Sequence, residues 1–144
     1  MRPFRYLPHT ADMRFRAYGK GLAEAIENSA LALLGIMLDV SRIRAVKGGE
    51  YAMPVNESAD TEEELVWFVL QDMLSKVDSR KASAYALRVS KLESKDGRLR
   101  LSGSILCKRS REDNSLLSVK AVTPSGLVVR RRNGLCSIQV VVDV

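Results

Sequence analysis

The fold class depends on residues 13–38, which read MRFRAYGKGLAEAIENSALALLGIML. Apolar and basic side chains alternate in residues 13–17, which is the period of a half-exposed strand. A turn with two glycines follows at residues 19–21, and apolar side chains then recur at the spacing of a helix. The helical stripe consists of Leu22, Ile26, Ala30, Leu33, Leu34 and Met37. The stretch therefore predicts a strand followed directly by a helix that ends near Leu38.

A second helix is predicted farther along the chain, ending near Lys76. Asp60, with Glu63 three residues later, forms a variant of the capping box that begins many helices. The apolar stripe of this helix consists of Leu65, Val66, Val69, Leu70, Met73 and Leu74.

The remaining segments are predicted to be strands joined by turns. They cover residues 4–6, 43–46, 50–55, 84–92, 98–107, 116–122, 127–131 and 135–142. Asn133-Gly134, between the last two, is the strongest hairpin signal in the chain. Because two helices interrupt many strands without a regular βαβ alternation, we predict an α+β fold with both helices packed on one face of a multi-stranded sheet. We expect the core to contain Leu33, Leu34, Leu65, Val69, Ile138 and Val140.

The composition is typical of one globular domain. The chain has 144 residues, of which 46% are apolar and 28% are charged, and no linker, repeat or low-complexity segment divides it. We therefore predict a single domain that covers residues 1–144. The net charge of +6 is consistent with an anionic partner such as RNA, and equally with an ordinary basic surface.

The sequence gives no indication of export or of membrane insertion. The first residues lack the apolar segment of a secretory signal, and the longest apolar stretch, residues 30–38, is too short to span a bilayer. Cys107 and Cys136 lie in apolar, strand-like stretches without a C-x-x-C spacing, as expected for buried free thiols in a reducing compartment. We therefore expect a cytoplasmic protein without a membrane partner.

Three aspartates are candidate functional residues. Asp12 lies in a break before a strand, and Asp143 closes the last strand, one residue before the α-carboxylate of Val144. Like charges held close together repel each other, and a hard cation bound through oxygen ligands relieves that repulsion. Asp39 follows the first predicted helix, where the helix dipole disfavours a carboxylate. A solvated, frayed chain end explains Asp143 and Val144 equally, so the spacing leaves both readings open.

Signals for other chemistry are weak. Nucleophile-elbow, phosphate-loop and zinc-protease motifs are absent, and the presence of one histidine, His9, excludes a multi-histidine metal site. Two basic groups, residues 108–111 and 130–132, are explained by a solvated loop and a strand end, with a phosphate-facing patch as the alternative. Lys120 differs, because it lies in an apolar strand-like segment, where a lysine often has an assigned partner.

Several segments together resemble the archease family. The opening run Tyr6-Leu7-Pro8-His9-Thr10-Ala11-Asp12 resembles the family's His-Thr-Ala-Asp signature. The resemblance extends, in the same order, over nearly the whole chain. Its other segments are residues 22–26, 30–33, 38–40, 64–67, 119–123 and 142–144.

The resemblance implies a function in tRNA processing. Archeases are accessory proteins of the RtcB-type RNA ligase, which joins tRNA halves in tRNA splicing and repairs RNA with GTP and a divalent metal. A member of the family is expected to be non-catalytic, to promote guanylylation and multiple turnover of the ligase, and to broaden its nucleotide use. Its contact with tRNA would be indirect, through the ligase.

The resemblance also implies a metal site. It places a divalent cation, calcium in the first place and magnesium as the alternative, on Asp12, Asp143 and the main-chain oxygen of Val144. Asp39 and Lys120 are implied as further functional positions. The expected ligands thus come from both ends of the chain, as the distribution of the aspartates also indicates.

One segment departs from the family pattern, and two other functions stay open. Relatives commonly continue after residues 120–123 with an aromatic residue and a histidine, whereas this chain has Pro124-Ser125-Gly126, so any role of that histidine is absent. The first alternative is a chaperone-like or RNA-binding escort of tRNA-processing enzymes, which the positive charge favours. The second is a small metal-dependent hydrolase that uses Asp12 and Asp143, for which His9 is the one candidate base.

Overall fold

The computed structural model describes residues 2–8 and 12–144. The predicted signature residues His9, Thr10 and Ala11 therefore lie outside the described residues. In chain order, the elements are β1 (Phe4–Leu7), β2 (Met13–Gly19), α1 (Leu22–Met37), α2 (Val40–Ala45), β3 (Glu50–Ala59), α3 (Glu62–Arg80), β4 (Ser83–Lys95), β5 (Arg98–Lys108), β6 (Ala121–Arg132) and β7 (Leu135–Asp143).

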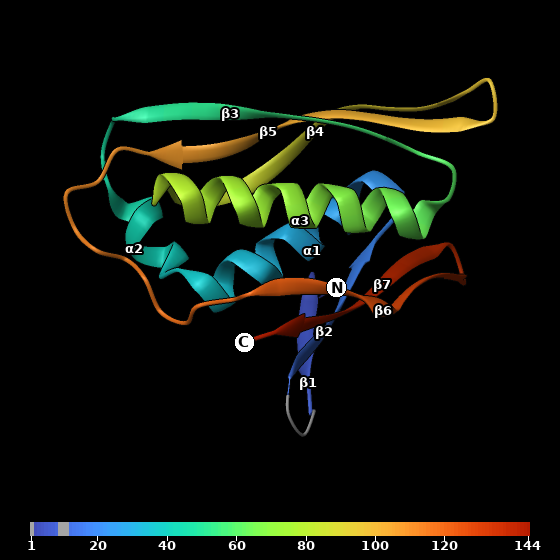
Figure 1. The fold of residues 1–144 in the computed structure, drawn as a ribbon, viewed down its shortest axis with the longest axis horizontal. Helices are drawn as coiled ribbons and strands as arrows, with labels where there is room; N and C mark the ends of the chain where they lie inside the picture. Colours follow the sequence, from blue (N-terminus) through green and yellow to red (C-terminus); the bar gives the residue numbers. More distant parts are fainter. Residues whose placement is uncertain (1, 9–11) are drawn as a thin grey trace.

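The strands form two antiparallel sheets, and the long helices α1 and α3 lie between them (Figure 1). The four-stranded sheet has the order β1-β2-β7-β6, and the three-stranded sheet has the order β3-β5-β4. α1 packs against β2 and β4, and α3 packs against β6 and β3, so each helix contacts both sheets. The α+β class is confirmed, with both helices on one face of each sheet.

The division into two sheets corrects the prediction of a single sheet. Its physical reason lies in α1, where ten of the sixteen residues are buried. An apolar surface of that width cannot be covered by one sheet, because a helix on a single sheet buries only one stripe. The three-stranded sheet covers the remaining side.

α3 begins one residue later and ends one turn further on than predicted. Thr61, and not Asp60, is the N-cap, because its hydroxyl oxygen accepts the backbone N–H of Glu64 at 3.1 Å. Val77 adds a further buried position beyond Lys76. The helix ends where Lys81 takes a left-handed backbone conformation, with φ of 50°. Such a residue is a frequent helix terminator.

Two predicted strands are wrong. Residues 43–46, predicted as a strand, belong mostly to the short helix α2, whose one buried residue is Ile43. The ammonium of Lys108 donates to the carbonyls of Arg44 and Val46 at the end of this helix, where a cation is favoured. The predicted strand at residues 116–122 enters a sheet only at Ala121.

The hairpins and the core are confirmed. Asn133 and Gly134 have φ values of 52° and 77°, as a type I′ turn between β6 and β7 requires. All six predicted core residues, Leu33, Leu34, Leu65, Val69, Ile138 and Val140, have no exposed surface. Cys107 and Cys136 are buried free thiols, and burial raises the pKa of both. No helix in the described part of the chain is long and apolar enough to cross a membrane.

A carboxyl pair between β3 and α3 makes the fold sensitive to pH. Burial and the neighbouring Asp72 raise the pKa of Glu57 to about 7, while Lys76 acts in the opposite direction. Glu57 is therefore protonated in the folded chain at pH values where it is ionised in the unfolded chain. Its contribution to the free energy of unfolding is fully present below about pH 4.5 and is lost as the pH rises through about 7.

Replacing Glu57 with glutamine is expected to raise the free energy of unfolding at pH 8 by more than it does at pH 5. The uncharged amide removes the repulsion with Asp72, and we expect a gain of about 1 kcal/mol, because the site is partly open to solvent. Urea unfolding of both proteins at the two pH values measures the effect. Glu50, exposed on the same strand, provides the matched Glu50→Gln control. An equal change in both variants would contradict this account.

Candidate functional site

The predicted ligands Asp12 and Asp143 lie at the same end of two paired strands. β2 and β7 are antiparallel, and Met13 of β2 is paired with Val142 of β7. Asp12 directly precedes Met13, and Asp143 directly follows Val142, so the register places the two aspartates on the next rung. β7 is a central strand between β2 and β6, which fixes the position of this end. The sequence thus supplies two carboxylates to one end of the four-stranded sheet.

Lys120 and Val144 lie beside this pair. The backbone N–H of Lys120 donates to the carbonyl of Asp143 at 2.8 Å, and Ala121 is paired with Asp143. Asp143 and the Lys120 side chain are exposed, whereas Asp12 is half-buried and Val144 packs partly against the core. We call Asp12, Lys120, Asp143 and Val144 the strand-end group. The structure therefore brings four of the five predicted positions into one neighbourhood.

The strand-end group offers oxygen atoms, the ligand type that a hard cation prefers. Its carboxylates and main-chain carbonyls are all oxygen ligands, which calcium and magnesium prefer. In residues 2–8 and 12–144, no three His, Cys, Asp or Glu side chains lie close enough together to hold a metal ion. A cation at this edge would therefore need main-chain oxygens in addition to Asp12 and Asp143.

Asp39 has a different local role from the one that its sequence position suggests. It follows α1, as predicted, but it is also the N-cap of α2, and its carboxylate accepts the backbone N–H of Arg42 at 3.2 Å. At the start of a helix the dipole favours a carboxylate, so the expected electrostatic misplacement is wrong. The signal was missed because residues 40–45 read as loop and strand.

One segment connects Asp39 to the strand-end group. The N–H of Asp39 donates to the carbonyl of Asn114, and Ser115 forms a bridge with Leu38. The next residues satisfy carbonyls at the end of α1, through Leu116 N–H to Met37 and Leu117 N–H to Ile36. The segment then reaches Lys120. Asp39 and Lys120 therefore lie at the two ends of this segment, which spans at most about 21 Å from Asn114 to Lys120 when fully extended.

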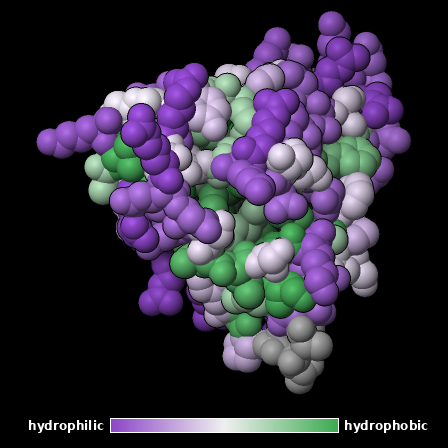
Figure 2. Space-filling model, turned by 60° about the vertical axis from the view of Figure 1, so that its left-hand side comes forward, coloured by the Kyte–Doolittle hydropathy of each residue, from purple (hydrophilic) through white to green (hydrophobic). Residues whose placement is uncertain are grey.

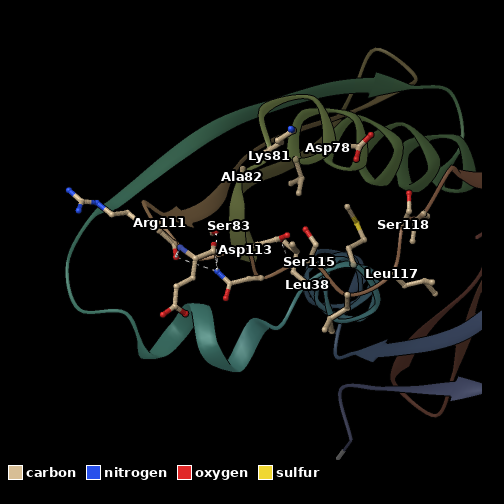
Figure 3. Close-up of a pocket in the computed structure, with 17 residues that line it drawn as sticks. Leu38, Asp78, Lys81, Ala82, Ser83, Arg111, Asp113, Ser115, Leu117 and Ser118 are labelled. Carbon is tan, nitrogen blue, oxygen red and sulfur yellow. Dashed lines mark hydrogen bonds between the residues drawn. The ribbon is translucent and has the colours of Figure 1, made fainter.

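A groove of about 600 Å³ lies along this segment (Figure 3). Its apolar side includes Met37, Leu38 and Val77, at the ends of α1 and α3, and its charged rim includes Lys81 and Asp113. Hydrogen bonds from Ser115 lower the pKa of Asp113, which fixes a carboxylate at this rim. Figure 2 shows apolar surface gathered in and below a hollow on one side of the molecule, bordered by polar side chains.

The segment that borders the groove is anchored on one side and exposed on the other. Asn114 is buried, and its amide donates to Ser83, Ser110 and the Glu112 carbonyl. Leu116 and Leu117 are 62% and 44% exposed, which is unusual for leucine. The lining of the groove includes Leu38 and Val119, which are the direct neighbours of Asp39 and Lys120. Sequence reasoning missed the groove, because residues 116–120 were expected to be paired in a sheet.

The segment that departs from the family pattern forms an irregularity of β6. The register between β6 and β7 shifts between Thr123 and Val128, a stretch that contains Pro124, Ser125 and Gly126. Gly126 has a φ of 83°, and a Cβ at this position would approach Val141 to 3.3 Å. α3 holds the start of the strand, since Trp67 donates to the carbonyl of Val122 at 2.7 Å. The position of Lys120 is thus maintained independently of the bulge.

Comparison with known proteins places the chain in a family. The model of the archease protein family matches residues 4–144. The Protein archease of Methanosarcina barkeri is 30% identical over 98% of this chain and 95% of its own length. That of Saccharolobus islandicus is 45% identical, but over only 33% of this chain and 34% of its own length.

Solved structures agree with this placement. Protein 1598 of Methanobacterium thermoautotrophicum superimposes with a TM-score of 0.82 at 27% identity and covers all of both chains. An archease of Thermotoga maritima, described as a possible chaperone, shares the fold with a TM-score of 0.58 at 18% identity, covering all of this chain and 98% of its own. The chain belongs to the archease protein family.

Proposed function

We propose that this archease activates an RtcB-type RNA ligase as a non-catalytic accessory protein. The observation that supports the proposal most directly is the strand register, which brings residues implied by the family resemblance to one end of the four-stranded sheet. The proposed action is to promote guanylylation and repeated turnover of the ligase and to broaden its nucleotide use. In this proposal the ligase selects the tRNA substrate and brings it to the complex.

The proposal includes a divalent cation, calcium in the first place, on Asp12, Asp143 and the main-chain oxygen of Val144. A bound cation would neutralise two carboxylates that the register holds on adjacent strand ends. The ligands would hold the ends of β2 and β7 next to the backbone of Lys120, whose side chain is exposed. The result is a rigid, charged edge that a partner can recognise.

The groove is the second part of the proposed ligase-binding surface. Asp39 and Lys120 flank its two ends, and exposed Leu116 and Leu117 lie on the segment between them. An interface commonly combines an apolar centre with a charged rim, which is the arrangement found along this segment. We expect Leu116 and Leu117 to be covered when the ligase binds.

A ligase assay tests this proposal. The cognate RtcB-type ligase is incubated with GTP, divalent metal and RNA substrate, with and without the chain. Ligase guanylylation and the number of ligations per ligase molecule are then measured. We expect both to rise when substoichiometric chain is added. No change in either quantity over a range of metal concentrations would contradict the proposal.

A chaperone-like escort of tRNA-processing enzymes is the second candidate function. The exposed pair Leu116 and Leu117 beside a 600 Å³ groove favours it, because exposed apolar surface can hold a partly folded segment. Light scattering of a heated tRNA-processing enzyme, with the chain or with its Leu116→Ser/Leu117→Ser variant, measures this activity. Suppression of aggregation that depends on the two leucines would support the chaperone reading.

A further inference from the structure

The outer face of the four-stranded sheet, turned away from α1 and α3, is rich in arginine. Phe15 and Ala17 of β2 are fully buried against the helices, so the alternating residues Arg14, Arg16 and Tyr18 point to the other side. By the same alternation, Gln139 of β7 lies on the outer face between the buried Ile138 and Val140. The arginines of this face are Arg5, Arg14, Arg16, Arg130 and Arg132.

The strand register gathers these arginines across the sheet. Arg5 of β1 is paired with Arg16, and Arg16 is paired with Gln139 of β7. On the other side of β7, Arg130 is paired with Ser137 and Arg132 with Leu135. Residues directly opposite each other in an antiparallel pair share a face, and like charges there are destabilising. The directly opposed pair Arg5 and Arg16 therefore costs stability, and an anion bound beside the two side chains would offset this cost.

The outer-face arginines have no acidic partners among the described residues. Arg16 donates to the side-chain oxygen of Gln139 at 2.9 Å, and Arg14 donates to the carbonyl of Pro8. None of the five forms an ion pair with a described carboxylate. Arg131, on the opposite face of β6, is different, because both of its terminal nitrogens contact Glu62, at 2.7 and 2.5 Å. The basic run 130–132 is thus divided between a structural ion pair and two uncompensated guanidinium groups.

A cavity of about 380 Å³ opens on this face. Arg16, Arg130 and Arg132 line it, together with Tyr18 and Leu135. Its three charged groups are all arginines, whose planar guanidinium groups bind phosphate oxygens in a bidentate manner. The half-buried ring of Tyr18 and the 37% exposed Leu135 add apolar surface suited to a sugar or a base.

We propose that this face binds the sugar–phosphate backbone of an RNA strand directly. The arginines extend from β1 to β6, which is three strand intervals of about 4.8 Å, or about 14 Å. That width exceeds one phosphate group and fits successive phosphates of a strand, with one nucleotide over the cavity. The choice of RNA as the polyanion rests on the proposed function, whereas the phosphate contact rests on the arginines alone. The face is distinct from the groove, so RNA and a ligase could be bound together.

A binding experiment with two charge-matched variants tests the proposal. A fluorescent single-stranded RNA of mixed sequence is titrated with the isolated chain between 50 mM and 300 mM NaCl, and anisotropy is recorded. The first variant is Arg16→Gln/Arg130→Gln/Arg132→Gln. The second, on the three-stranded sheet, is Arg88→Gln/Lys95→Gln/Arg100→Gln, whose three residues are exposed and form no ion pair with any described residue. Each variant loses three positive charges, so the two have the same net charge.

The expected result is a loss confined to the first variant. Each phosphate contact on a single strand contributes about 0.7 to the slope of log affinity against log salt, so three lost contacts lower the slope by about 2 and the affinity at 0.1 M salt about 100-fold. We expect the second variant to stay within about threefold of the unmodified chain. Equal losses in both variants, or no binding of RNA by the unmodified chain at 50 mM salt, would overturn the proposal.

Two further measurements separate this inference from its alternatives. Vesicles with 30% phosphatidylserine replace the RNA, and binding to vesicles without binding to RNA would overturn the proposal in favour of a lipid surface. Circular dichroism of the first variant checks that the fold is retained. The ligase is absent throughout, so failure here leaves ligase activation untouched, and loss of ligase activation with intact RNA binding would contradict only the proposed function.

Discussion

Replacing Asp12 or Asp143 with alanine is expected to abolish calcium binding by the isolated chain and its activation of an RtcB-type ligase. Each substitution removes one of the two aspartate carboxylates that attract the cation. We expect the unmodified chain to bind calcium at the weak end of protein sites, with a Kd of about 10⁻⁴ to 10⁻³ M. Isothermal titration calorimetry should give no measurable heat for either variant.

Thermal unfolding provides a second readout of the same change. A ligand at 100 times its Kd stabilises the folded chain by about 2.7 kcal/mol, which corresponds to roughly 8 °C for a domain of this size. The two variants should lose this calcium-dependent rise while keeping the melting temperature of the metal-free chain within a few degrees. Their core is unaffected, because Asp143 is exposed and Asp12 lies outside the strand interior.

Asp60→Ala is the matched control for these variants. Asp60 is an exposed aspartate far along the chain, and its ion pair with Arg98 is also exposed. The Asp60→Ala variant should bind calcium and activate the ligase as the unmodified chain does. Calcium binding of unchanged affinity in the Asp12→Ala and Asp143→Ala variants would show that the strand-end group is not the cation site.

The parts of the fold that follow from the sequence are those in which one local signal dominates. The apolar stripe of residues 22–37 is long and regular, so α1 was predicted almost to the residue. Asn133-Gly134 supplies the two positive φ values that a two-residue hairpin needs, so the final hairpin was also correct. In both cases, propensity and tertiary packing favour the same structure.

The parts of the fold that the sequence did not predict depend on contacts with distant residues. α2 is six residues long, too short to be stable alone, and it depends on the Asp39 cap, buried Ile43 and the Lys108 ammonium at its other end. The segment from Asn114 to Lys120 has a strand-like pattern, but it pairs with the end of α1 rather than with a strand. Neither partner is visible in a local window of sequence.

The candidate site also combines features that the sequence shows with features that depend on distant residues. The sequence pattern and the family resemblance together selected Asp12, Asp39, Lys120, Asp143 and Val144, but the register of β2 and β7 had to be known before four of them could be placed together. Arg130 and Arg131 look equivalent in the sequence, yet one faces the outer cavity and the other pairs with Glu62. The two faces of a strand are assigned by its partners, and a basic run at a strand end does not reveal them.

Replacing Leu33 with alanine is expected to lower the free energy of unfolding by about 2–5 kcal/mol. Leu33 lies in the middle of α1, between the two sheets, and has no exposed surface, so the lost methyl groups leave a cavity that the surrounding layers fill only in part. A loss of that size is a large fraction of the total stability of a typical domain, and it should lower the melting temperature by roughly 6–15 °C. Urea unfolding at 25 °C measures it.

The control for this prediction is Leu116→Ala, which removes the same atoms from a side chain that is 62% exposed. Its cost should stay within about 0.5 kcal/mol, because surface substitutions rarely cost more. The pair also separates stability from function. At a temperature where both variants are folded, Leu33→Ala should still bind calcium at the strand ends, whereas Leu116→Ala should weaken association with the ligase. A Leu33→Ala cost below 1 kcal/mol would mean that Leu33 is not packed in the core between the two sheets.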